Sequence, residues 1–174
     1  AVLNLLLDSD INYYLVTTMI ILIDDREKQP WKFPGVDTEF TRLETGDYTV
    51  KGFEDRFAVE RKSLDDLASS VGTERNRFEA EIQRAQDFDE FAVIVEASRA
   101  DVEAGSYYSK IHPNAVLGTT EKWPWKFDRL EFVWAGENDD GEKVRDMAAA
   151  RDHAPQEALR LLDRWYLKAA TDLF

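Results

Sequence analysis

The chain has 174 residues, of which 44% are hydrophobic and 12% are aromatic. This length is typical of one domain, and the apolar content is sufficient for a packed core. The sequence contains no cysteine, which excludes a disulfide framework, a cysteine-based zinc or iron–sulfur site and a thiol nucleophile. The formal net charge of −13 argues against nucleic-acid binding driven by broad positive charge. Any DNA contact is therefore expected to depend on a few placed cations, or on metal ions held by carboxylates.

The sequence predicts neither a membrane span nor a nucleotide cofactor. No apolar run approaches the roughly 20 residues that cross a bilayer. The first residues are largely apolar, but no Lys or Arg precedes Arg26, whereas a secretory signal begins with positive charge. The chain also lacks a P-loop and a GxGxxG motif. We therefore expect a cytoplasmic protein without a membrane partner.

Residues 1–18 are interpreted as an N-terminal extension of uncertain role, which precedes a domain over residues 19–174. The apolar run MIILID, residues 19–24, is typical of a buried strand. A loop with two Pro and one Gly follows, EKQPWKFPG. Three short strands are predicted after it, with bends at glycines between them, over 38–43, 47–50 and 56–60.

The hydrophobic period then changes to that of a helix. Leu64, Leu67, Ala68 and Val71 recur at helical spacing, and Ser63 is the expected N-cap. Further helices are predicted at 75–88, 113–122 (ended by Pro124), 142–151 and 155–170, and strands at 91–97 and 130–136. This order predicts an α/β fold with a central mixed β-sheet flanked by helices.

Acidic and basic side chains near the strand ends suit metal-dependent phosphodiester hydrolysis. Asp24 ends the first buried strand, Asp47 follows a glycine bend, and Glu60 ends a later strand. Carboxylates bind hard cations such as Mg²⁺ or Mn²⁺, which polarise phosphate and lower the pKa of a bound water. A lysine at the site can orient the nucleophile and offset negative charge. Because side chains two residues apart in a strand share a face, Glu60 and Lys62 can share a site while Arg61 points away.

The longer string resembles the XPF-type nuclease domain, whose signature is Gly-Asp, a gap, Glu-Arg-Lys, three residues and Asp. The matching residues are Gly46, Asp47, Glu60, Arg61, Lys62 and Asp66, with Asp24, Arg26 and Glu27 for the family's upstream D-x-R-E. The resemblance covers about residues 20–135. It implies a restriction-endonuclease-like core and metal-dependent DNA cleavage, often at branched, flap or junction structures in repair, recombination or replication. The chain lacks the paired helix-hairpin-helix and helicase modules of larger relatives, so it looks like a small stand-alone bacterial, archaeal or phage member.

The resemblance also implies roles for individual residues. Asp47 and Glu60 are expected to be the main ligands of Mg²⁺ (or Mn²⁺), with Asp24 as a further ligand directly or through water. Lys62 is expected to orient or activate the nucleophile. Supporting roles are expected for Arg26, Glu27, Arg61 and Asp66. The expected partner is DNA, and relatives suggest a homodimer, for which the C-terminal helices and the Trp-rich strand at 130–136 are candidate surfaces.

DNA contacts are predicted outside this cluster as well. Arg75 and Arg77 begin the second helix, and Lys110 lies in a loop with Tyr107 and Tyr108. Such a loop can contact the DNA backbone or stack on an unpaired base, and it can equally be an ordinary solvated loop.

Each motif residue also has an ordinary structural interpretation. Asp47 fits a turn, Asp66 fits a capping box with Ser63, and Glu60 with Lys62 fits a surface ion pair. A catalytically silent DNA- or partner-binding module of the same fold is therefore the alternative function. An RNA-directed nuclease of this fold is a third possibility.

Overall fold

A six-stranded mixed sheet forms the centre of the molecule, in the order β2-β1-β3-β4-β5-β6. A computed structural model of the chain describes residues 19–172, so the predicted N-terminal extension lies outside the described residues. The strands are β1 (Ile20–Asp24), β2 (Asp37–Thr41), β3 (Tyr48–Val50), β4 (Phe57–Lys62), β5 (Glu90–Val95) and β6 (Leu130–Trp134). β3 pairs antiparallel with β1 and β4, whereas the other neighbours pair in parallel.

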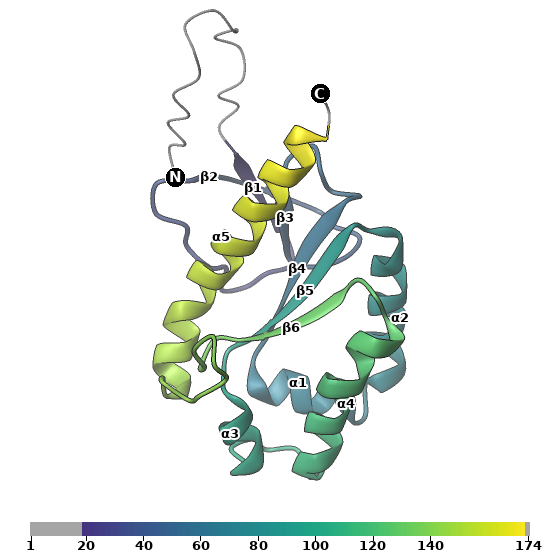
Figure 1. Cartoon of the computed structure of the whole chain (residues 1–174), viewed down its shortest axis with the longest axis vertical. Helices are drawn as coiled ribbons and strands as arrows, with labels where there is room; N and C mark the ends of the chain where they lie inside the picture. The colour runs from purple at the N-terminus through teal and green to yellow at the C-terminus, as the bar shows by residue number, and fades with distance from the viewer. Residues whose placement is uncertain (1–18, 173–174) are drawn as a thin grey trace, which may run out of the picture.

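Helices cover both faces of this sheet (Figure 1). They are α1 (Leu64–Val71), α2 (Arg75–Arg84) with the short 3₁₀ turn η1 (Ala85–Asp87), α3 (Arg99–Glu103), α4 (Pro113–Lys126) and α5 (Met147–Thr171). α5 packs on one face, where its stripe joins Ala92 and Ile94 of β5. α1, α2 and α4 pack on the other face, with Phe91 and Val93. Successive side chains of β5 thus point alternately into two hydrophobic clusters, as the period of a β-strand requires. No helix within residues 19–172 is long and apolar enough to cross a membrane.

The helix ends differ from the prediction at two prolines. α4 continues through Pro124, and a single helix, α5, passes through Pro155 where two closing helices were expected. A proline inside a helix removes one backbone hydrogen bond and costs about 3 kcal/mol. Here Trp123 and Phe127 flank Pro124, and Ala154 and Ala158 flank Pro155. All four side chains are buried in the core, so packing outweighs that cost. The predicted start of the closing helix was also early, because Asp146 caps α5 by accepting the N–H of Ala149 at 2.8 Å.

The topology gathers the acidic motif residues at one edge of the sheet. β1 and β4 both run antiparallel to β3, so the carboxyl ends of β1 and β4 lie beside the start of β3. Two backbone hydrogen bonds of 2.8 Å fix this edge, from Asp24 N–H to the carbonyl of Asp47 and from Asp47 N–H to the carbonyl of Val59. The strand ends therefore bring Asp24, Asp47 and Glu60 to the same region of the fold.

Gly46 allows this close approach. Its φ of 76° lies in the left-handed region, and a Cβ built on it would lie 2.7 Å from the Cβ of buried Ala58. A side chain at this position would therefore meet both backbone strain and a steric clash with β4, beside the motif residue Asp47.

We predict that Gly46→Ala lowers the free energy of unfolding by about 2–5 kcal/mol, the sum of backbone strain and overpacking. Gly35→Ala is the matched control, because Gly35 also has a left-handed φ, of 78°, but a Cβ added there would have no other atom within 4 Å. This variant should lose only the strain part, about 1–2 kcal/mol. Urea unfolding of both proteins measures the difference, and equal losses would show that the contact with β4 is not tight.

Candidate active site

Glu60 and Lys62 form a buried ion pair on one face of β4. Their side chains are in direct contact, with little exposure of either. The Lys62 ammonium also lies 5.0 Å from the ring centroid of Phe78 on α2. Burial alone would lower the pKa of Lys62, but the charge of Glu60 and its hydrogen bond raise that pKa above its usual value. The E-x-K spacing therefore produces the shared face that the sequence predicts.

Asp47 joins this pair from the start of β3. Its carboxylate Oδ2 accepts the backbone N–H of Arg61 at 2.8 Å, which holds it against the end of β4. Burial raises the pKa of Asp47 to about 6, and the charges of Glu27 and Glu81 add to the increase. Burial and then the charge of Asp47 raise the pKa of Glu60 well above its usual range. Two carboxyl groups thus lie close enough to oppose each other's ionisation.

This donor set fits a hard divalent cation that keeps part of its water shell. Mg²⁺ is usually held by one or two carboxylates, with waters and substrate phosphates completing its coordination. Within residues 19–172, no group of three or more His, Cys, Asp or Glu side chains is placed to hold a metal by itself. Asp47 and Glu60 are the residues that would hold Mg²⁺ or Mn²⁺, and a cation there would relieve their mutual repulsion.

Glu81 is a member of this site that sequence reasoning missed. It lies on α2, one helical turn after Phe78, and its charge acts on Asp47, Glu60 and Lys62. The helical spacing between Phe78 and Glu81 was visible in the sequence, but which helix faces the strand end was not. Glu81 therefore adds a third negative charge near the pair from a separate element.

The carboxylate of Asp24 is occupied by neighbours of its own. Oδ1 accepts the backbone N–H and the Nε of Arg26, at 2.9 and 2.6 Å, and Oδ2 accepts the N–H of Leu43 at 2.8 Å. The predicted D-x-R-E pair is thus an ion pair that fixes Arg26, whose side chain is 58% exposed. In this arrangement Asp24 orients the guanidinium of Arg26. The role of Asp24 as a metal ligand stays a prediction.

Arg61 lies on the opposite face of β4 and anchors a separate network. Its Nε donates to Glu96 at 2.9 Å, its NH1 donates to Glu27 at 3.1 Å, and its guanidinium carbon lies 5.5 Å from the ring centroid of Trp31. Trp31 Nε1 donates to the same Glu96 oxygen at 2.9 Å. Among the described residues, the other oxygen of Glu96 is buried without a hydrogen-bond partner. Arg61 therefore neutralises a buried carboxylate behind the site.

The remaining predicted residues lie around this centre with varied contacts. Asp66 forms the capping contacts with Ser63: its N–H donates to Ser63 Oγ at 3.1 Å, and that hydroxyl donates back at 2.6 Å. Arg75 is engaged by α4, because its guanidinium lies 4.9 Å from the Trp123 ring centroid. Arg77 is exposed and lies 3.6 Å from Glu74, whereas Lys110 is exposed and forms no ion pair within the described residues. Their DNA contacts, and metal support by Asp66, stay predictions.

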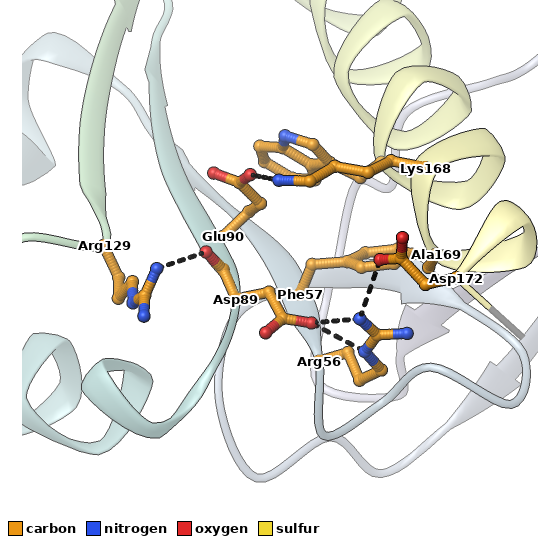
Figure 2. A pocket seen from close by; sticks show the side chains of 9 residues that line it. Arg56, Phe57, Asp89, Glu90, Arg129, Lys168, Ala169 and Asp172 are labelled. Carbon is orange, nitrogen blue, oxygen red and sulfur yellow. Dashed lines mark hydrogen bonds and ion pairs between the residues drawn. The ribbon is translucent and has the colours of Figure 1, made fainter.

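The small cavity in Figure 2 lies at the other end of β4 from Glu60 and Lys62, where the strand begins at Phe57. Two of its three cations are held in ion pairs with carboxylates, whereas the third, Arg129, donates to the backbone carbonyl of Asp89 at 3.4 Å. Arg56 contacts Asp89 at 2.6 Å, and Lys168 contacts Glu90 at 2.9 Å. The signature residues suited to hydrolysis, Asp47, Glu60 and Lys62, do not line this cavity and lie at the opposite edge.

Comparisons with known proteins agree with the motif. The family model described as the ERCC4 domain matches residues 23–140, which include both signature segments. No match is found among curated protein sequences. Among solved structures, the chain is similar to XPF from Aeropyrum pernix, with a TM-score of 0.56, 17% identity, and coverage of 88% of this chain and 68% of that chain. The predicted XPF-type resemblance and the α/β fold, a mixed sheet flanked by helices, are confirmed.

We predict that Arg61→Ala lowers the free energy of unfolding by about 3 kcal/mol, because it removes the closer of the two cations that pair with the buried Glu96 carboxylate and leaves only Arg151, at 3.6 Å. The matched control is Arg42→Ala, which breaks an exposed pair with Asp25 at 2.9 Å and should cost at most about 1 kcal/mol. Urea denaturation of both variants measures the losses. Similar small losses would mean that Arg61 does not stabilise the buried network.

The raised pKa of Asp47 predicts a pH-dependent gain from Asp47→Asn in the absence of metal. A folded pKa of about 6 lies above the usual aspartate pKa of 3.8, so ionised Asp47 destabilises the fold progressively as pH rises between these values. Relative to the unmodified protein, the free energy of unfolding of Asp47→Asn should be unchanged near pH 4 and higher by up to about 3 kcal/mol at pH 7. Unfolding in EDTA across this range tests the prediction. A flat Asp47→Asn profile would contradict the predicted shift.

Proposed function

The chain belongs to the ERCC4 domain family, and we propose that it is a divalent-metal-dependent DNA endonuclease. The observation that carries this proposal is the meeting of Asp47, Glu60 and Lys62 at one edge of the sheet, inside the matched region. Two carboxylates and an ammonium group in this arrangement are what hydrolysis of a phosphodiester bond by a hard cation requires.

The side chains divide the work of the proposed reaction. When bound, the divalent cation polarises the phosphate and lowers the pKa of a bound water. Asp47 and Glu60 supply anionic oxygens to hold that cation. Lys62, fixed by Glu60 and by the ring of Phe78, presents a positive charge where negative charge grows on the phosphate. By resemblance, attack in line would leave a 5′-phosphate and a 3′-hydroxyl.

The network around Arg61 supports this site without touching the phosphate. Its backbone N–H holds Asp47, while its guanidinium faces Glu96 and Glu27 on the other side of the strand. Arg26 is paired with Asp24 through Nε and NH2, but its guanidinium is more than half exposed, so it can make a further contact to a DNA phosphate through NH1. This placement supports the supporting roles that the resemblance implies for these residues.

The proposed substrate is branched, flap or junction DNA, and the proposed cofactor is Mg²⁺ or Mn²⁺. The XPF-type resemblance supports both. A homodimer rests on the resemblance alone, because Trp123, Trp134 and the apolar stripe of α5 are buried within the fold. β6 is an edge strand of the sheet and is the remaining candidate surface for pairing. The alternative is a catalytically silent module, although every signature position is filled.

We predict that the protein cuts DNA only with a divalent metal, and that Lys62→Ala lowers the single-turnover rate by about 10²–10³-fold. Asp47→Asn and Glu60→Gln should lose metal-supported cleavage, because each removes an anionic oxygen ligand. The measurement uses labelled flap, fork, junction, single-stranded and linear duplex DNAs, and matched RNAs, with Mg²⁺, Mn²⁺ or EDTA. Lys51→Ala is the control, since Lys51 is an exposed lysine paired with Glu39 at 2.8 Å.

A second readout separates the proposal from its alternatives. Mn²⁺ should raise the melting temperature of the unmodified protein by binding the folded state, and should do so far less in Asp47→Asn. Cleavage of RNA alone would replace the DNA proposal with an RNA-directed nuclease. Absence of cleavage together with a melting curve unchanged by millimolar Mn²⁺ would favour the silent module.

A further inference from the structure

Tyr108 is presented to solvent with no role in the core. Its exposed fraction is 96%, the highest among the exposed large hydrophobic side chains of the described residues. The adjacent Tyr107 differs, because it packs against the cluster under α1 and α4 and donates its hydroxyl to the carbonyl of Ile111 at 3.0 Å. Aromatic rings usually contribute to stability by burial. Full exposure of Tyr108 therefore gives the fold no such benefit.

The loop that carries Tyr108 is held by hydrogen bonds. The backbone N–H of Tyr108 donates to Asp65 Oδ1 at 2.8 Å, and the N–H of Ser106 donates to the carbonyl of Asp101 at 3.0 Å. The N–H of Ile111 donates to Ser109 Oγ at 3.3 Å. A ring on a fixed backbone loses less conformational entropy on binding than a ring on a loose loop. The loop is thus suited to present its aromatic side chain to a ligand.

The contact with Asp65 places Tyr108 beside the candidate active site. Asp65 lies in the first turn of α1, three residues after Lys62, so their Cα atoms are at most about 11 Å apart. In Figure 1, the connection from α3 to α4 runs along the end of the molecule where α1 lies. The ring is therefore exposed within a few nucleotides of the place where the phosphate would be cut.

The charge of the protein makes an uncharged contact valuable here. With a net charge of −13, the chain cannot rely on general attraction to phosphates. Stacking of a base on an aromatic ring depends little on net charge and tolerates any sequence. Lys110, exposed two residues further along the same loop, can contact the phosphate of the same nucleotide. A base inside a duplex has both faces covered by its neighbours, so away from the duplex ends only an unpaired base offers a free face.

We propose that Tyr108 is a stacking platform for an unpaired DNA base within a few nucleotides of the scissile phosphate. The proposal rests on the proposed nuclease function and assigns one subsite to it. This subsite would favour DNA with a single-stranded nucleotide at the junction over continuous duplex. It would do so without reading the identity of the base.

Two DNAs of the same sequence test this subsite: a fork with single-stranded arms and a blunt duplex. Separate versions of the fork carry 2-aminopurine at the first, second or third unpaired position. Binding is measured by fluorescence anisotropy in Ca²⁺, and single-turnover cleavage in Mg²⁺. Tyr108→Ala should bind the fork about 5–150-fold more weakly, leave duplex binding unchanged and abolish the quenching of 2-aminopurine. Tyr108→Phe should retain fork binding and quenching, because the ring is kept.

Trp125→Ala is the matched control, since Trp125 is 89% exposed on α4 and carries no role in the proposal. It should bind both DNAs normally, and all three variants should melt like the unmodified protein. Unchanged fork binding by Tyr108→Ala, or an equal loss on fork and duplex, would overturn the stacking subsite while leaving the nuclease proposal intact. An unmodified protein that neither binds nor cuts any DNA would instead overturn the nuclease function, and the subsite with it.

Discussion

The end of β4 is the part of the structure on which the rest depends. Three consecutive residues place charge on both sides of one strand, with Glu60 and Lys62 facing α2 and Arg61 facing the cluster under α5. The alternation of side chains in a strand makes this division unavoidable. The backbone N–H of Arg61 also holds the carboxylate of Asp47, so a single strand end joins the acidic pair to the buried network behind it. A shift of register by one residue would exchange the two faces.

The sequence predicted those parts of the fold that depend on local periodicity. The E-x-K pair, the Ser63 cap and the apolar stripe of α5 follow from residues close together in the chain, and the structure shows each of them. The helix ends at the two prolines were predicted wrongly. The free-energy cost of a proline is local, whereas the burial that compensates for it comes from packing against the sheet. Glu81 and Glu96 were missed for a related reason. Each acts on residues far away in the sequence, and only the packing of α2 and the order of the strands bring them near β4.

Local neutralisation reconciles the acidic composition with a site for a polyanion. The cations near the strand ends are nearly all engaged by carboxylates: Arg26 by Asp24, Lys62 by Glu60, and Arg61 by Glu96. The net charge at the site is then set by Asp47, Glu60 and Glu81. Their excess negative charge favours a divalent cation over a bare phosphate. A metal ion would reverse the sign of this edge locally, while the rest of the surface stays acidic. Association would therefore depend on divalent metal more than on the general charge of the protein.

The hairpin formed by β3 and β4 has a consequence for how the family signature tolerates variation. Asp47 begins the hairpin and Glu60 closes it, while the turn between the strands, residues 51–56, lies at the far end of the two strands. Residues added to or removed from that turn would lengthen or shorten the loop without changing the distance between the two carboxylates. The signature can therefore leave the number of residues between Gly-Asp and Glu-Arg-Lys unspecified, because an antiparallel pair keeps these two ends together whatever the length of the turn. The same turn is a site where a reporter peptide or an affinity handle can be inserted while the spacing of the acidic groups is preserved.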